Sequence, residues 1–393
     1  MRVLIVGAGI AGSTLAYWLQ RAGHEPTLLE RAPALRRGGY LIDFWGTGFD
    51  VAERMGIVPR LLHEGYQLTE ARDVASDGHQ LASLDPQRLV AGASGRYVSI
   101  LRADLATAIY DALEEGVETI FGDTVARLIE GERSVHVEFE QGGEREFDLV
   151  VGADGLHSRV RELVFGEESR FERDLGIAVA AFDVASYRPR DELVAVMHAE
   201  VGFQAIRVAL QDDLTMFMLT FRHHGSVPID DVGAQQKVVR TSLARAGWEI
   251  PAILDQLPQA RTLYLDRANQ IRMPSWTSGR VALIGDAAAS PSLLAGQGSA
   301  LAMVEAYVLA TELTATPADH RRAFEAYERR LMPMLRSKQD AAKGLGTAFA
   351  PPSRLHLMLR TTMMRFMGFP PVAHLAMGRS LRDPIKLPTW PGS

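Results

Sequence analysis

Two glycine-rich stretches, each with a carboxylate beside it, carry the clearest chemical signal in this sequence of 393 residues. The first is GAGIAG at 7–12, and Glu30 follows it. The second is GDAAASPSLLAGQGS at 285–299, in which Asp286 comes directly after an apolar run. Backbone N–H groups of glycine-rich turns can approach phosphates, and carboxylates can accept hydrogen bonds from sugar hydroxyl groups. The chain therefore has either two nucleotide sites or one long cofactor held at two places.

The first stretch lies within a predicted strand–helix–strand unit. Apolar residues predict strands at 2–6 and 26–30, with a helix at 13–23 between them. Glu30 ends the second strand, where the acid of a dinucleotide-binding unit holds the adenosine ribose hydroxyls. A carboxylate there disfavours the 2′-phosphate of NADP, because both groups are negative. The residues of this unit leave FAD or NAD as the dinucleotide.

Each glycine of the first stretch has its own role in such a unit. Gly7 permits a tight turn, Gly9 lets the backbone approach a pyrophosphate, and Gly12 allows close packing of the helix on the strand. The stretch 7–12, which includes Ile10 and Ala11, follows the strand and opens the helix. Its N-terminus offers free N–H groups and the positive end of the helix dipole to the phosphates.

Composition excludes several classes of function. Hydrophobic residues make up 47% of the chain and charged residues 23%, which is typical of a globular protein with a large core. The net charge of −6 argues against nucleic acid or an anionic membrane as the main partner. The absence of cysteine excludes disulfides and thiolate metal sites, and we predict no metal site. Because no apolar run reaches the roughly 18 residues of a membrane helix, we expect a cytoplasmic protein with no membrane span.

Apolar periodicity predicts mixed helices and strands in the rest of the chain. Residues 118–151 alternate as in a β-meander that ends in a buried strand. The segments that predict an antiparallel sheet are 177–184, 192–198, 203–209 and 214–221. A strand is predicted at 280–284, and the predicted helices are 47–56, 103–115, 234–247, 299–313 and 319–345. The last fifty residues look helical and are rich in methionine.

Further stretches distinguish FAD from NAD. RADL at 102–105 begins a predicted helix, DLVVGADGLHSRVR at 148–161 predicts a strand, a turn and a helix, and 285–299 contains Pro291. Together with 7–12, these stretches resemble the motif set of the single-component, class A flavoprotein monooxygenases, in order and in spacing. That family includes the p-hydroxybenzoate hydroxylase type and the tetracycline-inactivating monooxygenases. The resemblance runs from residue 1 to about residue 335.

The resemblance implies the fold class and the division into domains. The expected fold is α/β (α+β overall), with a Rossmann-like FAD-binding domain that contains a β-meander, an interleaved antiparallel-sheet substrate domain, and C-terminal helices. The FAD-binding domain is expected at 1–70, 100–172 and 266–340, the substrate domain at 71–99 and 173–265, and a C-terminal helical segment at 341–393.

The resemblance also implies which residues contact FAD. Arg102 would lie at the pyrophosphate or ribityl region, Asp154-Gly155 near both FAD and the nicotinamide, and Asp286 at the ribityl hydroxyls. The expected cofactor-binding residues are Gly7, Gly9, Ile10, Ala11, Gly12, Glu30, Arg31, Arg37, Asp43, Arg102, Asp154, Gly155, Gly285, Asp286, Pro291, Gly296, Gly298 and Ser299. Ser299 and Glu305 depart from the family pattern, which often has Asn and Asp there, so the fine geometry at the flavin is expected to differ.

The implied activity is oxygenation of a small, aromatic or polyketide-like molecule. In this family NADPH or NADH reduces FAD as a transient reductant, O2 adds at the flavin C4a to form a hydroperoxide, and one oxygen passes to the substrate. An FAD oxidase or dehydrogenase without oxygen insertion is the alternative, and a flavin-binding sensor without turnover is a third possibility. We expect a monomer or a homodimer.

Substrate contacts are expected on the antiparallel sheet. The alternation of 203–209 and 214–221 predicts one face that offers Phe203, Arg207, Met216 and Met218, although such residues are more often core than pocket. Phe44 is a further candidate, in an aromatic run at 40–45 that can equally belong to the core. No catalytic base is assigned. At the C-terminus, a helix with apolar and arginine residues is interpreted as packing on the substrate domain rather than on a membrane.

Overall fold

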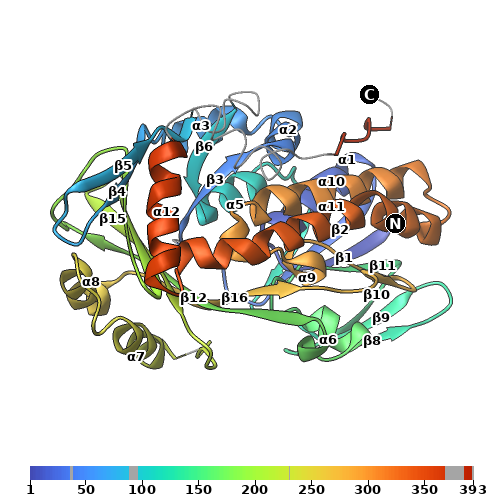
Figure 1. The fold of residues 1–393 in the computed structure, drawn as a ribbon. Coiled ribbons are helices and arrows are strands. Elements are labelled where there is room, and N and C mark those ends of the chain that lie inside the picture. The colour runs from blue at the N-terminus through green and yellow to red at the C-terminus, as the bar shows by residue number, and fades with distance from the viewer. Residues whose placement is uncertain (36–38, 88–95, 230, 368–384, 392–393) are drawn as a thin grey trace.

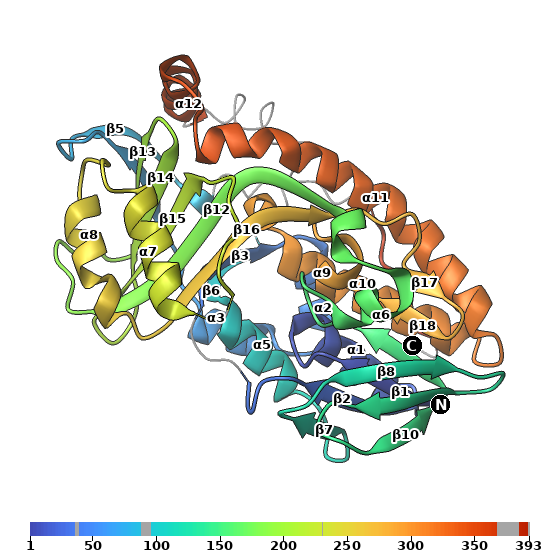
Figure 2. The same cartoon turned by 90° about the horizontal axis from the view of Figure 1, so that it is seen from below.

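The computed structural model of the chain describes residues 1–35, 39–87, 96–229, 231–367 and 385–391, and the expected cofactor residue Arg37 lies outside them. A largely parallel sheet with its helices and an antiparallel sheet lie next to each other (Figure 1 and Figure 2). Helix α11 (His320–Phe349) runs along both halves of the molecule. The expected α/β class with an interleaved antiparallel sheet is confirmed.

A six-stranded sheet, parallel except at one edge, forms the first half, in the order β17-β18-β11-β1-β2-β7. The strands are β1 (Arg2–Val6), β2 (Glu25–Glu30), β7 (Glu118–Phe121), β11 (Leu149–Gly152), β17 (Thr277–Ser278) and β18 (Val281–Leu283). Strands β1, β11 and β18 are almost continuous runs of buried apolar residues, as expected where helices cover a parallel sheet. The strands predicted at 2–6, 26–30 and 280–284 are therefore confirmed.

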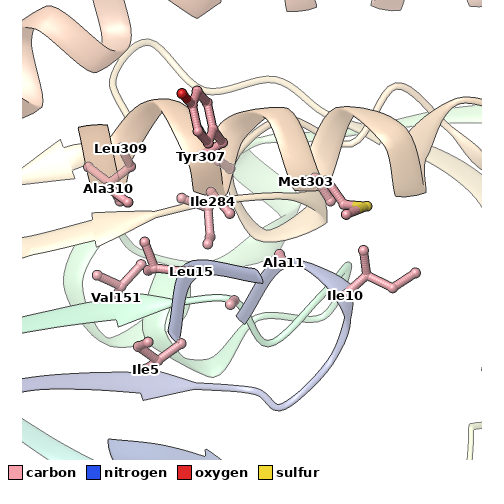
Figure 3. Close-up of a cluster of buried hydrophobic side chains, with 14 of the residues drawn as sticks. Ile5, Ile10, Ala11, Leu15, Val151, Ile284, Met303, Tyr307, Leu309 and Ala310 are labelled. Atoms are coloured by element: carbon pink, nitrogen blue, oxygen red, sulfur yellow. The ribbon is translucent and has the colours of Figure 1, made fainter. Parts of the chain in front are cut away.

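Helices α1 (Ile10–Arg21) and α10 (Gly298–Ala315) pack against each other on this sheet. In Figure 3, Ile5 and Leu15 point into the same apolar core as Ile284 and Met303. Helix α10 is apolar on nearly all sides, which is typical of a helix at the centre of a core. The other helices of this half are α2 (Thr47–Arg54), α3 (Val58–Glu64), α5 (Arg102–Tyr110) and α6 (Arg159–Phe165).

The β-meander predicted over 118–151 is only partly correct. Its middle forms a three-stranded antiparallel sheet of β8 (Val125–Glu130), β9 (Val135–Phe139) and β10 (Glu144–Phe147). Its two ends, β7 and β11, instead join the parallel sheet beside β2 and β1. Periodicity alone cannot separate these strands, because it does not report which strand lies next to which.

The second half is a seven-stranded sheet in the order β16-β12-β15-β14-β13-β4-β5. Its strands are β4 (Glu70–Val74), β5 (Gln80–Leu84), β12 (Glu172–Ala185), β13 (Val194–Glu200), β14 (Phe203–Ala209), β15 (Leu214–Arg222) and β16 (Leu263–Ile271). One face is covered by α7 (Val232–Ser242) and α8 (Ile250–Gln256). The predicted antiparallel sheet is confirmed, and the predicted helix at 234–247 ends earlier, before a separate α8.

Short elements connect the two halves. Strands β3 (Leu41–Trp45) and β6 (Tyr97–Leu101) form a two-stranded antiparallel pair. Helix α9 (Asp286–Ala289) follows β18 directly, and a 3₁₀ turn at Leu293–Ala295 precedes α10. The 3₁₀ turns at Glu168–Arg170 and Leu257–Gln259 complete the set of described short helices.

The C-terminal region is helical only in part. Helix α12 (Arg354–Met367) packs on β5, at the far end of the antiparallel sheet (Figure 1). Residues 385–391 form no helix and return to the first half, where the Trp390 ring lies 4.7 Å from that of Trp18. The prediction that the last fifty residues look helical is therefore correct for 354–367 and wrong for 385–391, where Trp390 packs against the core beside α1 instead.

No described helix combines the length and the apolar character that crossing a membrane requires. Nor do the described residues contain three or more His, Asp or Glu side chains arranged to hold a metal ion.

A buried ion pair fastens α12 to the antiparallel sheet. Arg360 Nη1 donates to both carboxylate oxygens of Asp73 on β4, at 2.9 and 3.1 Å, and the two side chains are 6% and 1% exposed. Arg360 Nε also donates to the carbonyl oxygen of Ala348, at 3.2 Å. A charge at this position cannot be solvated if its partner is removed.

We therefore expect Asp73→Ala to lower the free energy of unfolding by about 3–5 kcal/mol, because it leaves Arg360 buried and unpaired. Urea unfolding monitored by circular dichroism measures this change. Asp255→Ala is the control, at an exposed position of α8 where the side chain has no hydrogen bond or ion pair to a described residue, and its urea midpoint should equal that of the wild type. A midpoint for Asp73→Ala equal to that of the control would contradict this role of the ion pair.

Candidate functional site

A cavity of about 870 Å³, counted with its open mouth, lies between the two halves of the molecule. The lining residues come from the turns and helices that follow strands of the parallel sheet, from the β3–β6 pair and its flanks, from strand β16 and from both glycine-rich stretches: Gly9, Ile10, Ala11, Tyr40, Ile42, Arg102, Ala153, Gly155, Leu156, Tyr264, Arg267, Asn269, Asp286, Ser290, Ser292, Leu293, Gly296, Gly298, Ser299 and Ala302. The two stretches therefore serve one cavity rather than two separate sites.

The near end of the cavity is the N-terminus of α1. Gly9 is the N-cap of this helix, and no side chain caps it. Gly7 and Gly12 lie below the surface: a Cβ on Gly12 would lie 1.9 Å from the carbonyl oxygen of Gly7, and a Cβ on Gly7 would lie 2.5 Å from that of Ala153. Only glycine allows these backbones to approach so closely, and this approach brings the helix N-terminus to the cavity wall.

Glu30 lies beside this turn. Its Oε2 accepts a hydrogen bond from the N–H of Ala8 at 3.0 Å, and its Oε1 accepts one from the N–H of Ala32 at 2.9 Å. The carboxylate therefore holds the glycine-rich turn against the end of β2. Arg31, the next residue, is exposed and does not line the cavity.

The far end of the cavity is formed by Asp286 and the N-terminus of α10. Asp286 starts α9 and lines the cavity, as do Gly296, Gly298 and Ser299. No side chain caps α10 at Gln297, so the first N–H groups of an 18-residue helix face the cavity region without a capping acceptor. A helix N-terminus favours negative charge near it.

A buried carboxyl group holds the turn before Asp286. Oε2 of Glu305 accepts from the N–H of Gly285 at 2.8 Å and from the hydroxyl of Tyr327 at 3.3 Å, and Glu305 is 2% exposed. Tyr327 also contacts the carbonyl oxygen of Leu283, at 3.0 Å. Burial raises the pKa of Glu305 well above its ordinary value, so the group is held in its neutral form. Glu305, one of the two residues that depart from the family pattern, thus lies behind the turn and not at the cavity surface.

Arg102 places a positive charge inside the cavity. Its side chain is surrounded by protein yet accessible, because it faces the open cavity space. Among the described residues its guanidinium has no hydrogen-bond or ion-pair partner. Burial raises the pKa of Tyr40 to about 12 and raises that of Tyr264 well above its ordinary value, so both phenols stay neutral near Arg102. The cavity therefore offers an unpaired cation to a negatively charged ligand.

The turn between β11 and α6 is held by polar side chains. Asp154 accepts hydrogen bonds from Ser158 Oγ at 2.5 Å and from the N–H of Val160 at 3.1 Å, and burial raises its pKa. Ser158 in turn caps α6. The fully buried Arg161 donates to the carbonyl oxygen of Ala287 at 3.0 Å and so ties this turn to α9. Asp154 thus shapes the turn, while its neighbour Gly155 lines the cavity.

Strand β16 supplies cavity residues that the sequence patterns did not single out. Tyr264, Arg267 and Asn269 line the cavity from this strand. Arg267 Nη2 donates to Glu172 Oε1 at 2.6 Å, and Asn269 Nδ2 donates to the same oxygen. Alternate positions of a strand face one side, so Arg267 and Asn269 could have been grouped with a cavity if the strand had been recognised. The predicted domain boundary at 265/266 falls inside β16.

Asp43, Pro291 and Gly285 are further expected cofactor residues that lie near the cavity without lining it. Asp43 accepts hydrogen bonds from the Tyr97 hydroxyl at 2.6 Å and from Ser99 Oγ at 2.7 Å, on the β3–β6 pair. Pro291 contributes its carbonyl oxygen to Gln270 Nε2, at 3.2 Å. Gly285 gives its N–H to the buried carboxyl group described above.

The shared face predicted for Phe203, Arg207, Met216 and Met218 is wrong. In the β14–β15 register, Phe203 lies opposite Phe221 and Arg207 opposite Phe217, on the face covered by α7 and α8. Met216 and Met218 lie on the other face, opposite Val208 and Ile206. Alternation is visible in each strand separately, but only the register determines which positions of two strands share a face.

None of the five expected substrate residues is among the described residues that line the cavity. Arg207 is buried in ion pairs with Asp191 at 3.0 Å and Glu249 at 3.2 Å, so its charge is already compensated. Phe44 is fully buried in the main core, where its ring centroid lies 6.0 Å from that of Phe49.

Comparison with known proteins places this arrangement among flavoproteins. A family model described as an FAD binding domain matches residues 1–337. A curated flavin-dependent monooxygenase from an unknown prokaryote is 33% identical over 350 residues, which cover 89% of this chain and 90% of the relative. An uncharacterized protein of Mycobacterium tuberculosis is 37% identical, over 83% of this chain and 88% of its own length.

Solved structures show the same similarity. The crystal structure of tetracycline destructase Tet(55) aligns with a TM-score of 0.83 and 29% identity, over 99% of this chain and 98% of that one. Klebsiella pneumoniae HpxO in complex with FAD and uric acid aligns with a TM-score of 0.81 over 98% of both chains. Its identity of 21% supports the fold only.

His157 provides a pH-dependent link between the two halves. Its ring nitrogens contact Asp266 of β16 at 3.3 Å and Glu168 at 2.9 Å, and these two acids raise its pKa to about 10. Because the pKa is above its unfolded value of 6.5, the stabilisation is complete below pH 6.5 and is lost as pH rises towards 10. The side chain is 38% exposed, so screening limits the effect to about 1 kcal/mol or less.

We expect His157→Gln to be less stable than the wild type at pH 6, with a difference that shrinks steadily up to pH 10. Urea unfolding at a series of pH values measures it. His63→Gln, at an exposed position on α3, is the control and should show no such trend. A stability difference for His157→Gln that does not change with pH would exclude the ionic link.

Proposed function

The chain belongs to the FAD-dependent monooxygenase family, and we propose that its central cavity binds FAD in an extended form with a small organic substrate beside it. As a member of this family, the protein is a flavoprotein oxidoreductase whose substrates are a small molecule and O2. The observation that carries the proposal is that a single cavity receives two helix N-termini without capping side chains and an unpaired arginine.

The residues present fit FAD. A dinucleotide with a flavin is long and carries negative charge at its pyrophosphate, so it needs positive groups at one end and polar contacts along its length. The α1 N-terminus and Arg102 supply the positive groups, and Asp286 supplies an acceptor for ribityl hydroxyls. Because Gly9 and Gly298 have no side chains, FAD can approach the backbone of the cavity wall closely at these positions.

The protein residues bind, orient and exclude water. FAD, when bound, supplies the two-electron redox chemistry with NAD(P)H and the reaction with O2. The N-terminus of α10, at Gly298 and Ser299, favours negative charge on any group placed against it, by about 0.3–1 kcal/mol or more where it is partly buried. The tie from Arg161 to Ala287 and the contact of Glu305 with Gly285 keep the Asp286 turn fixed during turnover.

The proposal also covers the two domains, the substrate class, the cellular location and the oligomeric state. The FAD-binding domain comprises the parallel sheet and its helices, and the substrate domain comprises the seven-stranded sheet. The substrate is an aromatic or polyketide-like molecule, in keeping with the similarity to a tetracycline destructase. Tyr40 and Tyr264, whose ring centroids lie 5.2 Å apart, provide an aromatic wall for it. The protein acts in the cytoplasm as a monomer or a homodimer.

Oxygen insertion separates this activity from that of an oxidase or dehydrogenase on the same fold. Purified protein loaded with FAD is incubated with NADH or NADPH, isotopically labelled O2 and tetracycline as the first probe. A product heavier by one labelled oxygen atom supports the monooxygenase. Oxidised but unlabelled organic product formed without NAD(P)H would instead identify an oxidase, if O2 is reduced to H2O2, or a dehydrogenase, if an added electron acceptor is required. Protein that acquires no flavin spectrum after FAD addition would refute the cofactor assignment.

Asp286→Ala should raise the dissociation constant for FAD about tenfold or more, because it removes charged acceptors for the ribityl hydroxyls. Quenching of FAD fluorescence by the apoprotein measures this constant. Asp255→Ala, at an exposed position on α8, is the control and should bind FAD as the wild type does. Equal constants for Asp286→Ala and Asp255→Ala would remove Asp286 from the site.

A further inference from the structure

One backbone N–H in the cavity wall points away from its own sheet. In the β3–β6 pair Leu41 lies opposite Leu101, and the N–H of Arg102 donates to the carbonyl oxygen of Tyr40 at 3.0 Å. Residues of an antiparallel pair alternate between those that exchange hydrogen bonds and those that do not. The N–H of Leu41, one position after Tyr40, therefore points outward and needs an acceptor elsewhere.

The acceptor comes from the other half of the molecule. Sδ of Met216 on β15 accepts a hydrogen bond from the N–H of Leu41, with the two atoms 3.1 Å apart. Met216 is 2% exposed and belongs to an apolar cluster that also contains Tyr66, Val208 and Leu210. A side chain without an acceptor at position 216 would therefore remove the acceptor that this N–H has among the described residues.

The contact between Met216 and Leu41 holds the segment 40–42, which forms part of the cavity wall. Leu41 lies between Tyr40 and Ile42, and both of these line the cavity. The Tyr40 ring also lies against Tyr264 of β16, with 5.2 Å between ring centroids. The cavity wall at 40–42 is thus joined to the antiparallel sheet at two points, a sulfur acceptor on β15 and a tyrosine on β16.

We propose that Met216 is a positioning residue, whose sulfur holds the Tyr40–Ile42 wall in place relative to the antiparallel sheet. Its link to catalysis rests on the proposed function, in which this wall borders bound FAD and substrate. The competing explanation is that Met216 only fills space in its cluster. The two explanations differ in which substitution of Met216, leucine or glutamine, should disturb the Tyr40–Ile42 wall more.

Met216→Leu keeps the volume and removes the acceptor, whereas Met216→Gln keeps the length and offers an oxygen acceptor. If the sulfur acts as an acceptor, hydrogen–deuterium exchange of a peptide over 39–46 should be about five- to tenfold faster in Met216→Leu, and Met216→Gln should restore part of the protection. A space-filling role predicts the reverse, with leucine harmless and glutamine disruptive. That reverse order overturns the proposal.

Met218→Leu is the matched control, since Met218 lies on the same strand and face but its sulfur has no hydrogen bond to a described residue. Its exchange over 39–46 should match that of the wild type. Exchange of a peptide over 2–6 in β1 is the internal reference, so that a general loss of stability is not mistaken for the local effect. Equal local exchange in Met216→Leu and Met218→Leu would also refute the role.

The effect of Met216 on the cavity can also be measured from the spectrum of bound FAD. The visible circular dichroism of bound FAD should change in Met216→Leu, shift back towards the wild type in Met216→Gln, and stay unchanged in Met218→Leu. An altered peptide exchange with an unaltered flavin spectrum would limit Met216 to the fold and overturn its positioning role. A wild type that binds no FAD would fail the proposed function instead, while the exchange experiment would still decide the contact with Leu41.

Discussion

The close packing of α1 against α10 on one parallel sheet is the constraint on which the site depends. Helix α1 follows the turn after β1, and α10 follows β18 by way of the short helix α9 and a 3₁₀ turn, so that both N-termini reach the same cavity. Gly12 allows α1 to approach the Gly7 carbonyl, and the apolar surface of α10 buries it beside α1. Two stretches almost 300 residues apart in the sequence thereby face a single cavity. Neither N-terminus could serve a long cofactor alone.

Buried polar groups hold the turns at that edge. Glu305 satisfies the N–H of Gly285, Arg161 the carbonyl oxygen of Ala287, and Asp154 the groups that start α6. Each pairing is buried, where an unpaired polar group costs about 1–3 kcal/mol, so the turns have few alternative conformations. The polar groups exposed to the cavity, by contrast, include Arg102, which no described side chain pairs. The polar groups behind the wall thus hold the turns in place, while Arg102 on the cavity surface is left for a ligand.

Local signals predicted the first half of the molecule better than the second. The glycine-rich turn, the apolar runs of β1 and β18 and the acid at Glu30 are short-range features, and the chain folds there as their spacing indicates. The faces of β14 and β15 were not predictable, because Phe203 and Met216 alternate correctly within their own strands and only the register separates them. The sequence analysis also missed three cavity residues, Tyr264, Arg267 and Asn269. They lie on β16 of the seven-stranded sheet, and only the packing of the two halves brings this strand to the cavity.

The cavity can therefore respond to both halves of the molecule. Its cofactor-side wall at Tyr40 and Ile42 belongs to the β3–β6 pair, yet it is attached to β15 and β16 of the antiparallel sheet. The turn at His157 is likewise attached to Asp266 of β16, one residue before the cavity residue Arg267. A shift of the antiparallel sheet relative to the parallel one would move these walls together rather than open a gap between them. Cross-sheet contacts of this kind allow a site built from two sheets to keep one geometry.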